Sequence, residues 1–496
     1  MPPMQRTSGV LLHPSSLWGR FGIGDLGPAA SEWIRFLGET KTGLWQILPL
    51  GPTGYGDSPY QTFSSFAGNT FLLSPTRLVR DGFLTPDDVE DVPDFPADRI
   101  DFGWVIGWKD DLLDTAYGHF KAGDAASWRL EVTEWAAAQP WLDDYALFRA
   151  LKDEYGGEPW TTWDQAVRLR DADALAEART RLADSVERHV LGQFLFARQW
   201  AEVKEEAHSA GVRIVGDLPI FVAADSADVW ANQELFMLDD EGQPLVVAGV
   251  PPDYFSATGQ LWGNPLYRWD RHHETGFAWW KARLRSVLDA VDIVRIDHFR
   301  AFADYWEIPA DAPTAETGRW QYGPGDAFFA AIRDEFGELP IIAEDLGELH
   351  DIVFELRDRW NLPGMSVLQF AFDGDPDNDF LPHRYREHSV AYTGTHDNDT
   401  TVGWWESASD TEKNMARNYL GTDGDDIAAA MVWAVWASRA EVAVAPLQDF
   451  LRLGTEARMN TPGEPAGNWS WRLRQEQLSD HLASEMRALN EAAHRV

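Results

Sequence analysis

The feature that most constrains the fold of this chain is a series of short apolar runs, each closed by a polar or charged residue. These runs occupy residues 43–50, 212–221, 291–297, 339–345, 366–372, 389–397 and 440–449. Nearly continuous apolar runs of this length are typical of parallel strands that are buried on both faces. Patterns typical of helices lie between many of them, for example at 277–291, 326–336 and 348–360. The alternation predicts an α/β fold of the (β/α)8 TIM-barrel type.

Two regions interrupt this alternation. Residues 80–205 are rich in Ala, Glu and Arg at helical spacing, and we expect them to form a largely helical insertion. Residues 221–275 are rich in Gly, Pro and aromatic residues and are too long for an ordinary barrel loop. We expect this region to be an active-site loop subdomain at the carboxyl ends of the strands. Because no Gly/Ser-rich linker separates these parts, residues 1–496 are expected to form a single (β/α)8 catalytic body.

Three of the runs deliver a carboxylate to the expected carboxyl end of a strand, namely Asp297, Glu344 and Asp397. In a (β/α)8 barrel the active site lies at this end of the strands. A single acid at such a position more often caps the following helix or forms a structural ion pair. Three acids on separate strand ends favour a catalytic interpretation, because cleavage of a glycosidic bond needs two or three carboxyl groups around one sugar carbon.

The neighbours of these acids support that interpretation. Arg295 lies two residues before Asp297, so both side chains project to the same side of a strand. A fixed cation there would keep Asp297 ionised, as a nucleophile must be. Glu344 follows the apolar residues Ile-Ile-Ala, and an apolar setting raises the pKa of a carboxyl toward that of a general acid. His298 and His396, each adjacent to an aspartate, are candidates for hydrogen bonds to sugar hydroxyls.

The same His and Asp pairs permit a metal-binding interpretation, since oxygen and imidazole ligands suit several divalent ions. The chain has no HExxH motif and no EF-hand spacing, so we expect no bound metal. It also has no cysteine, which excludes disulfides, thiolate chemistry and cysteine-held clusters. No cofactor is expected.

The charge of the chain excludes several classes of partner. The 80 acidic residues against 42 basic ones give a net charge of −38, the wrong sign for nucleic acid or an anionic membrane surface. No apolar run of about 18 residues and no apolar leader are present, so we expect a cytoplasmic protein. Two hypotheses account for the acidity. One is an ordinary acidic enzyme, and the other, which we favour, is adaptation to high salt that screens the self-repulsion.

Four blocks around the candidate acids resemble those of the α-amylase superfamily and occur in the same order. They are GDLPIFV (216–222), VRIDHFR (294–300), AEDLG (343–347) and GTHDND (394–399). Further segments are similar to those of the amylomaltases, the bacterial type of 4-α-glucanotransferase. They occupy residues 8–27, 45–52, 58–69, 249–267 and 458–472. The resemblance to amylomaltases therefore extends from near the N-terminus to about residue 472.

The resemblance implies a retaining enzyme that transfers α-1,4-glucan segments from a maltooligosaccharide or starch to the 4-OH of an acceptor glucan or glucose. It implies that Asp297 is the nucleophile, Glu344 the acid/base and Asp397 the transition-state stabiliser. Two departures stand out. Ala301 occupies a position where the family usually has Gly, and the Asn-His pair that follows the equivalent of Asp217 in amylases is absent. The second departure weakens the amylase interpretation, because amylomaltases carry the LPIFV found here.

An acceptor sugar competes with water, which is about 55 M, only if it is bound and oriented. Tyr254, Phe255 and Trp262 lie in the segment 249–267, which we interpret as an aromatic lid that stacks on glucose units. A packing loop is the alternative interpretation of this segment. Tyr60, close to the first expected strand, is a further candidate for stacking.

Two more polar residues are candidates for substrate contact. Asp217 could bind sugar hydroxyls or orient Arg295, or it could make a structural hydrogen bond below the site. Asn264 could contact sugar or belong to a turn that Pro265 fixes.

Two other functions stay open at this point. One is an α-amylase-like hydrolase, which would raise the number of reducing ends on maltotriose where a transferase would not. The other is a non-catalytic glucan-binding protein, against which the three intact carboxylates count. The expected partners are α-1,4-glucans with glucose as an acceptor, and we expect a monomer.

Overall fold

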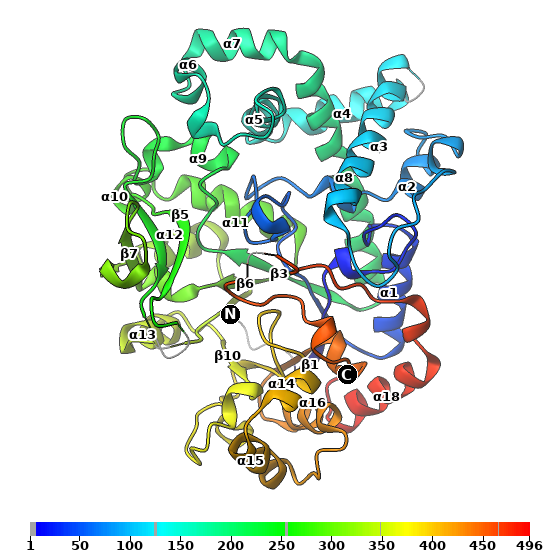
Figure 1. The fold of residues 1–496 in the computed structure, drawn as a ribbon, viewed down its shortest axis with the longest axis vertical. Helices are drawn as coiled ribbons and strands as arrows, with labels where there is room; N and C mark the ends of the chain where they lie inside the picture. Colours follow the sequence, from blue (N-terminus) through cyan, green and yellow to red (C-terminus); the bar gives the residue numbers. More distant parts are fainter. Residues whose placement is uncertain (1–5, 124–125, 253–255, 348, 465) are drawn as a thin grey trace.

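Eight parallel strands form the centre of the molecule, as Figure 1 shows for the computed structural model. The structure describes residues 6–123, 126–252, 256–347, 349–464 and 466–496. The barrel strands are β1 (Thr7–Leu11), β2 (Leu44–Gln46), β3 (Arg213–Pro219), β6 (Ile293–Asp297), β9 (Ile341–Ala343), β10 (Gly364–Val367), β11 (Ser389–Tyr392) and β12 (Val442–Pro446). Their order in the sheet is β10-β11-β12-β1-β2-β3-β6-β9. The predicted α/β barrel is confirmed.

The two outer strands of this sheet, β9 and β10, meet through hydrogen bonds at their ends. The amide of Ala343 donates to the carbonyl of Pro363 at 2.9 Å. The amide of Met365 donates to Oδ1 of Asp345 at 2.7 Å, and the Asp345 carboxylate also pairs with Arg357. Asp345, which directly follows the candidate acid Glu344, therefore helps to close the barrel.

All seven apolar runs contain a strand, but the run at 366–372 begins its strand earlier and ends it earlier than predicted. Strand β10 covers Gly364–Val367, and Leu368–Ala371 then form a single 3-10 turn. The amide of Gln369 donates to the carbonyl of Thr393 at 3.2 Å, which draws the chain toward the end of β11. This apolar run therefore contains a largely buried turn as well as a strand.

The eighth strand, β1, has no long apolar run because it begins with Thr7, Ser8 and Gly9. It is nevertheless buried along its whole length between β12 and β2. A Cβ on Gly9 would lie 3.0 Å from Cβ of Leu44, a tight contact, so glycine favours the close approach of the two strands.

Helices cover the outside of the barrel and precede most of its strands in the chain. They are α1 (Pro28–Glu39), α8 (Ala183–Ser209), α11 (Ala278–Ala290), α12 (Gly325–Phe336), α13 (Asp351–Arg359), α16 (Ile427–Ala437) and α18 (Asp480–Ala492). The last helix, α18, packs beside α1 and α16. After this helix, Arg495 donates to the carbonyl of Thr7 at 3.0 Å, so the end of the chain lies against the start of β1. No helix in the described part of the chain is long and apolar enough to cross a membrane.

The region 80–205 holds a further group of helices. They are α3 (Phe102–Ala122), α4 (Arg129–Ala137), α5 (Leu142–Glu154), α6 (Gln165–Arg168) and α7 (Ala172–Arg181), and they gather at the top of Figure 1. Helices α7 and α8 are separated at Leu182, whose backbone (φ −102°, ψ 19°) leaves the helical region. Shorter helices elsewhere are α2 (Pro75–Arg80), α9 (Ala227–Ala231), α10 (Trp269–Glu274), α14 (Thr401–Ser407), α15 (Asp410–Leu420) and α17 (Leu447–Phe450).

A second, antiparallel sheet lies beside the barrel. It contains β4 (Val246–Val250), β5 (Gln260–Pro265), β7 (Asp304–Pro309) and β8 (Arg319–Tyr322) in the order β5-β4-β7-β8. Strands from the region 221–275 thus pair with strands that follow β6 of the barrel. This pairing connects the aromatic segment around Trp262 to the chain that leaves Asp297.

Candidate active site

The three predicted acids lie where the chain leaves barrel strands at their carboxyl ends. Asp297 ends β6, Glu344 directly follows β9, and Asp397 lies in the loop after β11. None of them caps a helix: the side chain that caps α14 is Thr400, and the turn after Asp297 has no side-chain cap. The capping interpretation is therefore wrong for Asp297 and Asp397.

Arg295 joins two of the predicted site residues below this surface. Its Nη1 donates to Oδ2 of Asp217 at 2.6 Å and to Oδ1 of Asp297 at 3.1 Å. The side chain of Asp217 is 0% exposed, whereas that of Asp297 is 29% exposed. Burial raises the pKa of Asp297 to about 6, although the positive charge of Arg295 opposes this rise. Asp217 thus lies beneath the arginine, and Asp297 faces the open end of the barrel.

Glu344 is held by two backbone amides. Its Oε2 accepts from the amide of His298 at 2.7 Å, and its Oε1 accepts from the amide of Leu346 at 3.1 Å. Burial raises the pKa of Glu344 to about 7; Arg295 opposes the rise and the charge of Asp297 adds to it. Burial therefore makes both candidate carboxyls easier to protonate than ordinary surface carboxyls.

The residue that supplies the first of these amides has an unusual backbone. His298 has φ 54° and ψ 46°, in the left-handed region that few residues other than glycine adopt. Burial lowers the pKa of its imidazole to about 3, so the ring is neutral near pH 7. Ala301, the departure noted in the sequence, is fully buried in the following turn, and its amide donates to the His298 carbonyl at 3.1 Å.

Asp397 has a different environment from the other two acids. Its Oδ1 accepts from Nδ2 of Asn460 at 2.6 Å and lies 3.3 Å from Nε2 of His396. Arg458 donates to its backbone carbonyl at 2.7 Å. Burial opposes ionisation, but His396 and the hydrogen bond from Asn460 outweigh it and lower the pKa of Asp397 to about 2. The Asp397 side chain is 47% exposed, so an anionic group faces the open side of the site.

Tyr60 connects this acid to the arginine network. Its hydroxyl donates to Oδ2 of Asp217 at 2.8 Å and lies 3.3 Å from Nδ1 of His396. The Tyr60 and His396 rings are stacked, with centroids 4.9 Å apart. Trp469 packs against both rings, at 5.7 Å from Tyr60 and 5.9 Å from His396. The three rings form a wall that links Asp217 to Asp397.

A second aromatic group gathers around His298, the residue that follows Asp297. The ring of Trp262 meets that of His298 edge-on at 4.8 Å, and Phe221 lies 6.5 Å from Trp262. Asn264 is buried and donates to the carbonyl of Val222 at 2.8 Å. The predicted turn at Asn264 is wrong, because this residue lies within β5. The two other predicted lid residues, Tyr254 and Phe255, lie outside the described residues.

Sequence reasoning assigned no role to Asn460, Arg458 or Trp469, which the structure places around Asp397 and Tyr60. All three belong to the segment 458–472, which was noted only for its resemblance to a family. An amide such as Asn460 has no periodicity or charge pattern that would connect it to an acid so far away in the chain. The family segment was the one available signal.

The metal-binding interpretation of the His and Asp pairs gains nothing from this geometry. The His and Asp side chains at 396–397 contact each other and the neighbouring Asn460. Across the ranges that the structure describes, no three His, Asp or Glu side chains converge as a metal site would require.

The fold and the site together define a class of enzyme. Carboxylates at the carboxyl ends of barrel strands, two of them with pKa values raised by burial, form the arrangement used to break and remake glycosidic bonds. The chain thus has the architecture of a barrel enzyme that acts on glycosides.

Comparisons with known proteins show to which family of such enzymes the chain belongs. Residues 12–478 match the family model described as 4-alpha-glucanotransferase. The 4-alpha-glucanotransferase of Thermus thermophilus is 50% identical over 99% of this chain and 100% of its own length. The corresponding enzyme of Synechocystis is 48% identical over 98% of this chain and 97% of its own length. The chain belongs to the 4-alpha-glucanotransferase family and has that transferase activity.

Solved structures agree with this assignment. An amylomaltase from Streptococcus agalactiae in complex with acarbose has a TM-score of 0.96 and 39% identity, over 99% of this chain and all of that one. An amylomaltase from Corynebacterium glutamicum has a TM-score of 0.76 at 19% identity, over 99% of this chain and 74% of that one. The second likeness shows a shared fold.

Proposed function

We propose that this enzyme transfers α-1,4-glucan segments by a retaining double displacement, with Asp297 as nucleophile, Glu344 as acid/base and Asp397 as transition-state stabiliser. The observation that carries this assignment is the geometry of two carboxyls at the ends of the neighbouring strands β6 and β9. Arg295 holds the carboxylate of Asp297 at 3.1 Å, and the His298 amide holds Glu344 at 2.7 Å beside the nucleophile, while burial raises the pKa of both acids. Retaining enzymes need one ionised and one protonated carboxyl in this relation.

In the first step the Asp297 carboxylate attacks C1 of the donor sugar. The bond from C1 to the glycosidic oxygen breaks, and Glu344 gives its proton to that oxygen as the glucan departs. In the second step the Glu344 carboxylate takes the proton of an acceptor 4-OH, whose oxygen attacks C1. The bond between C1 and Asp297 then breaks, and two inversions leave an α-1,4 bond.

The remaining site residues support these steps. Arg295, anchored on Asp217, holds the Asp297 carboxylate at 3.1 Å and limits its rotation. The exposed Asp397 carboxylate faces the positive charge that develops on the sugar ring, and its low pKa keeps it ionised. We assign sugar-hydroxyl contacts to His396 and His298, and a wall position to Tyr60.

Transfer in place of hydrolysis requires that a sugar, not water, reaches the intermediate. We assign this control to the region 221–275, where Trp262 lies half-buried against His298 at the edge of the site. An aromatic ring there can stack on the acceptor and exclude water from one side of C1. The predicted lid roles of Tyr254 and Phe255, and a sugar contact by Asn264, belong to the same proposal.

We also propose that the substrates are maltooligosaccharides, amylose and starch, with glucose as the smallest acceptor, and that the enzyme is a salt-adapted monomer of the cytoplasm. The acidic balance of 80 to 42 charged residues and the lack of cysteine support this setting.

Incubation with maltotriose tests the proposed reaction. Transfer predicts glucose and a ladder of longer glucans with no net rise in reducing ends, whereas an amylase-like hydrolase would raise them. A steady rise in reducing ends without products longer than the substrate would contradict the proposal.

A further inference from the structure

A cluster of four side chains lies where the chain leaves β6 and β9, beyond the candidate catalytic acids. Its centre is Asp304, the first residue of β7, whose side chain is 4% exposed. Oδ1 of Asp304 accepts from Nε and Nη2 of Arg300 at 3.2 and 2.8 Å. Oδ2 of Asp304 pairs with Nδ1 of His350. One buried carboxylate therefore joins two segments that are far apart in the chain.

Trp320 of β8 is the fourth member of this cluster. The guanidinium of Arg300 lies over its ring, 4.2 Å from the centroid, and the ring of His350 meets it edge-on at 4.8 Å. A cation over an aromatic face and an edge-on ring pair are both favourable contacts. Because β8 pairs with β7, the indole is carried by the same sheet as Asp304. Ion pairing and aromatic packing thus hold the cluster together.

Each of the two joined segments carries one of the candidate catalytic acids. Arg300 lies in the turn that directly follows Asp297 and His298. Its charge adds to burial in lowering the pKa of the His298 imidazole, so the cluster lies close to the site. His350 ends the loop that begins with Glu344 after β9, and it directly precedes α13. The cluster connects the chain after the nucleophile to the chain after the acid/base.

The loop from Glu344 to His350 supplies one of the two amides that hold the acid/base. The amide of Leu346 donates to Oε1 of Glu344 at 3.1 Å. On one side of Leu346, the carboxylate of Asp345 anchors the loop to α13 and β10. On the other side, His350 anchors it to β7. Release of the second anchor would let the Leu346 amide move and would leave the Glu344 carboxyl less well oriented.

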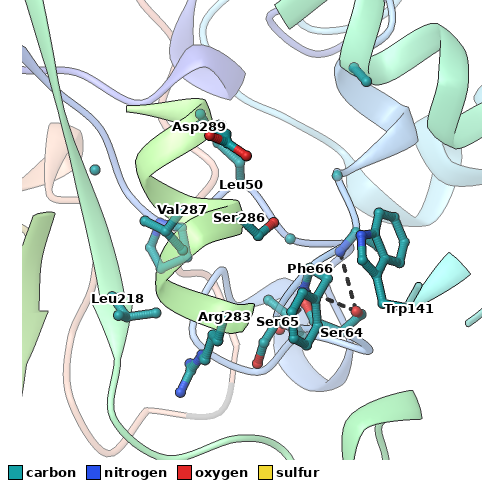
Figure 2. A pocket seen from close by; sticks show the side chains of 18 of the residues that line it. Leu50, Ser64, Ser65, Phe66, Trp141, Leu218, Arg283, Ser286, Val287 and Asp289 are labelled. Atoms are coloured by element: carbon teal, nitrogen blue, oxygen red, sulfur yellow. Dashed lines mark hydrogen bonds between the residues drawn. The ribbon is translucent and has the colours of Figure 1, made fainter. Parts of the chain in front are cut away.

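The cluster lies apart from the large cavity between α8 and α11, part of which Figure 2 shows. Ser64, Trp141 and Ser286 line that cavity, whereas none of the four cluster residues, all of them described in the structure, does so. Within the cluster, Arg300 and Asp304 are buried and pair with each other. The arrangement is therefore suited to holding two segments in place and not to binding a ligand in that cavity.

We propose that Asp304 and His350 are positioning residues, whose contact holds the loop after β9 so that the Glu344 carboxyl points at the glycosidic oxygen. The inference rests on the proposed role of Glu344 as acid/base. Neither positioning residue needs to touch the sugar. Loss of their contact should impair a reaction that takes a proton from Glu344 and spare one that does not. A purely structural ion pair would instead affect both reactions equally.

Two donor substrates separate these possibilities. Departure of a glucan from maltotriose needs a proton from Glu344, whereas departure of fluoride from α-glucosyl fluoride does not. In His350→Ala we expect kcat/KM to fall about 5- to 50-fold for maltotriose and to change by less than about twofold for the fluoride. Both constants scale with the concentration of folded enzyme, so partial misfolding does not alter their ratio. The His350 side chain does not cap α13, so this substitution removes no helix cap.

A second variant and a matched control accompany this measurement. Asp304→Asn changes the same contact from its other side and should shift the ratio in the same direction. His208→Ala is the control, because Nε2 of His208 pairs with Oδ1 of Asp292 at 2.8 Å, just before the amino end of β6. The side chains of His208 and His350 are 46% and 51% exposed, so the two substitutions are comparable. The control should leave the ratio unchanged.

Equal changes with both donors in His350→Ala, or no change with either, would overturn the proposal. A shift of the same size in His208→Ala would overturn it as well. Glu344→Gln separates this inference from the proposed function, because its ratio should fall further than that of any other variant. A fall in Glu344→Gln without one in His350→Ala defeats only the positioning role. If Glu344→Gln itself leaves the ratio unchanged, the proposed acid/base is wrong and this inference fails with it.

Discussion

The backbone amide of His298 donates a hydrogen bond of 2.7 Å to Oε2 of Glu344. Because His298 directly follows Asp297, this bond ties the candidate acid/base to the peptide that carries the candidate nucleophile. The left-handed backbone of His298, with φ 54°, accompanies the bond at the point where β6 ends. The strained backbone of His298 thus accompanies a hydrogen bond that fixes the carboxyl of Glu344 relative to Asp297, although the two acids lie at the ends of different strands.

The two carboxyls should produce a bell-shaped pH dependence. Below about pH 6 Asp297 becomes protonated and cannot attack, and above about pH 7 Glu344 loses the proton that it must donate. We expect kcat/KM for maltotriose to be highest between these values and to fall on both sides. In Glu344→Gln, measured with a glucosyl fluoride whose leaving group needs no acid, the alkaline fall in intermediate formation should disappear. A wild-type profile that stays flat to strongly alkaline pH would contradict these assignments.

Removal of the Asn460 amide should weaken catalysis by leaving Asp397 less well held. The hydrogen bond of 2.6 Å from Asn460 ends on a carboxylate, and such bonds contribute about 1.5–3 kcal/mol. If the hydrogen bond stabilises the transition state by this amount, Asn460→Ala lowers kcat about 10- to 100-fold. Asn468→Ala is the matched control, because Asn468 lies in the same segment and contacts only its backbone. Similar losses in both variants would assign Asn460 a role in folding the segment.

Trp262→Ala should change the balance between water and glucan as acceptors of the glucosyl group. Without the ring that lies against His298, water gains access to the intermediate and an acceptor glucan loses a stacking surface. We expect long-glucan transfer to fall more than hydrolysis, as measured by product chains against new reducing ends. Trp433→Ala, which removes a 48% exposed tryptophan on α16, should leave the ratio unchanged. Equal losses of both reactions in Trp262→Ala would argue against a lid.

The net charge of −38 predicts that salt stabilises the fold. Salt weakens surface ion pairs such as Arg452 with Glu485, but it also screens the repulsion among the excess acids, which outnumber the bases by nearly two to one. We expect the melting temperature to be clearly higher in multimolar KCl than in dilute buffer. A melting temperature that is unchanged or lower in salt would favour the ordinary acidic enzyme.

The barrel could be predicted because seven of its strands lie in mainly apolar runs that are visible in the sequence. The eighth, β1, was not visible, because it packs tightly against β2 through small residues such as Gly9 in place of large apolar ones. The hydrogen bonds that close the barrel between β9 and β10 could not be predicted either. They depend on the carboxylate of Asp345, and the sequence pattern does not distinguish its role from that of its neighbour Glu344.

The meeting of the candidate acids at one end of the barrel could also be predicted, because parallel strands present their carboxyl ends together. Their individual environments could not. The low pKa of Asp397 depends on His396 and also on Asn460, which comes from a distant loop. The position of Trp262 depends on the pairing of β4 with β7. Contacts between segments that are far apart in the chain leave no periodic signal in either segment.

The central claim is that Asp297 forms the covalent bond to the sugar, and peptide mass spectrometry tests it most directly. In Glu344→Gln, an activated α-glucosyl fluoride can still react with the nucleophile, but the base that would activate the next acceptor is absent. We predict that the trapped protein carries one added glucosyl group on the peptide that contains Asp297, and that Asp297→Asn in the same background carries none. A label on any other residue, or an equal label on the Asp297→Asn protein, would contradict the claim.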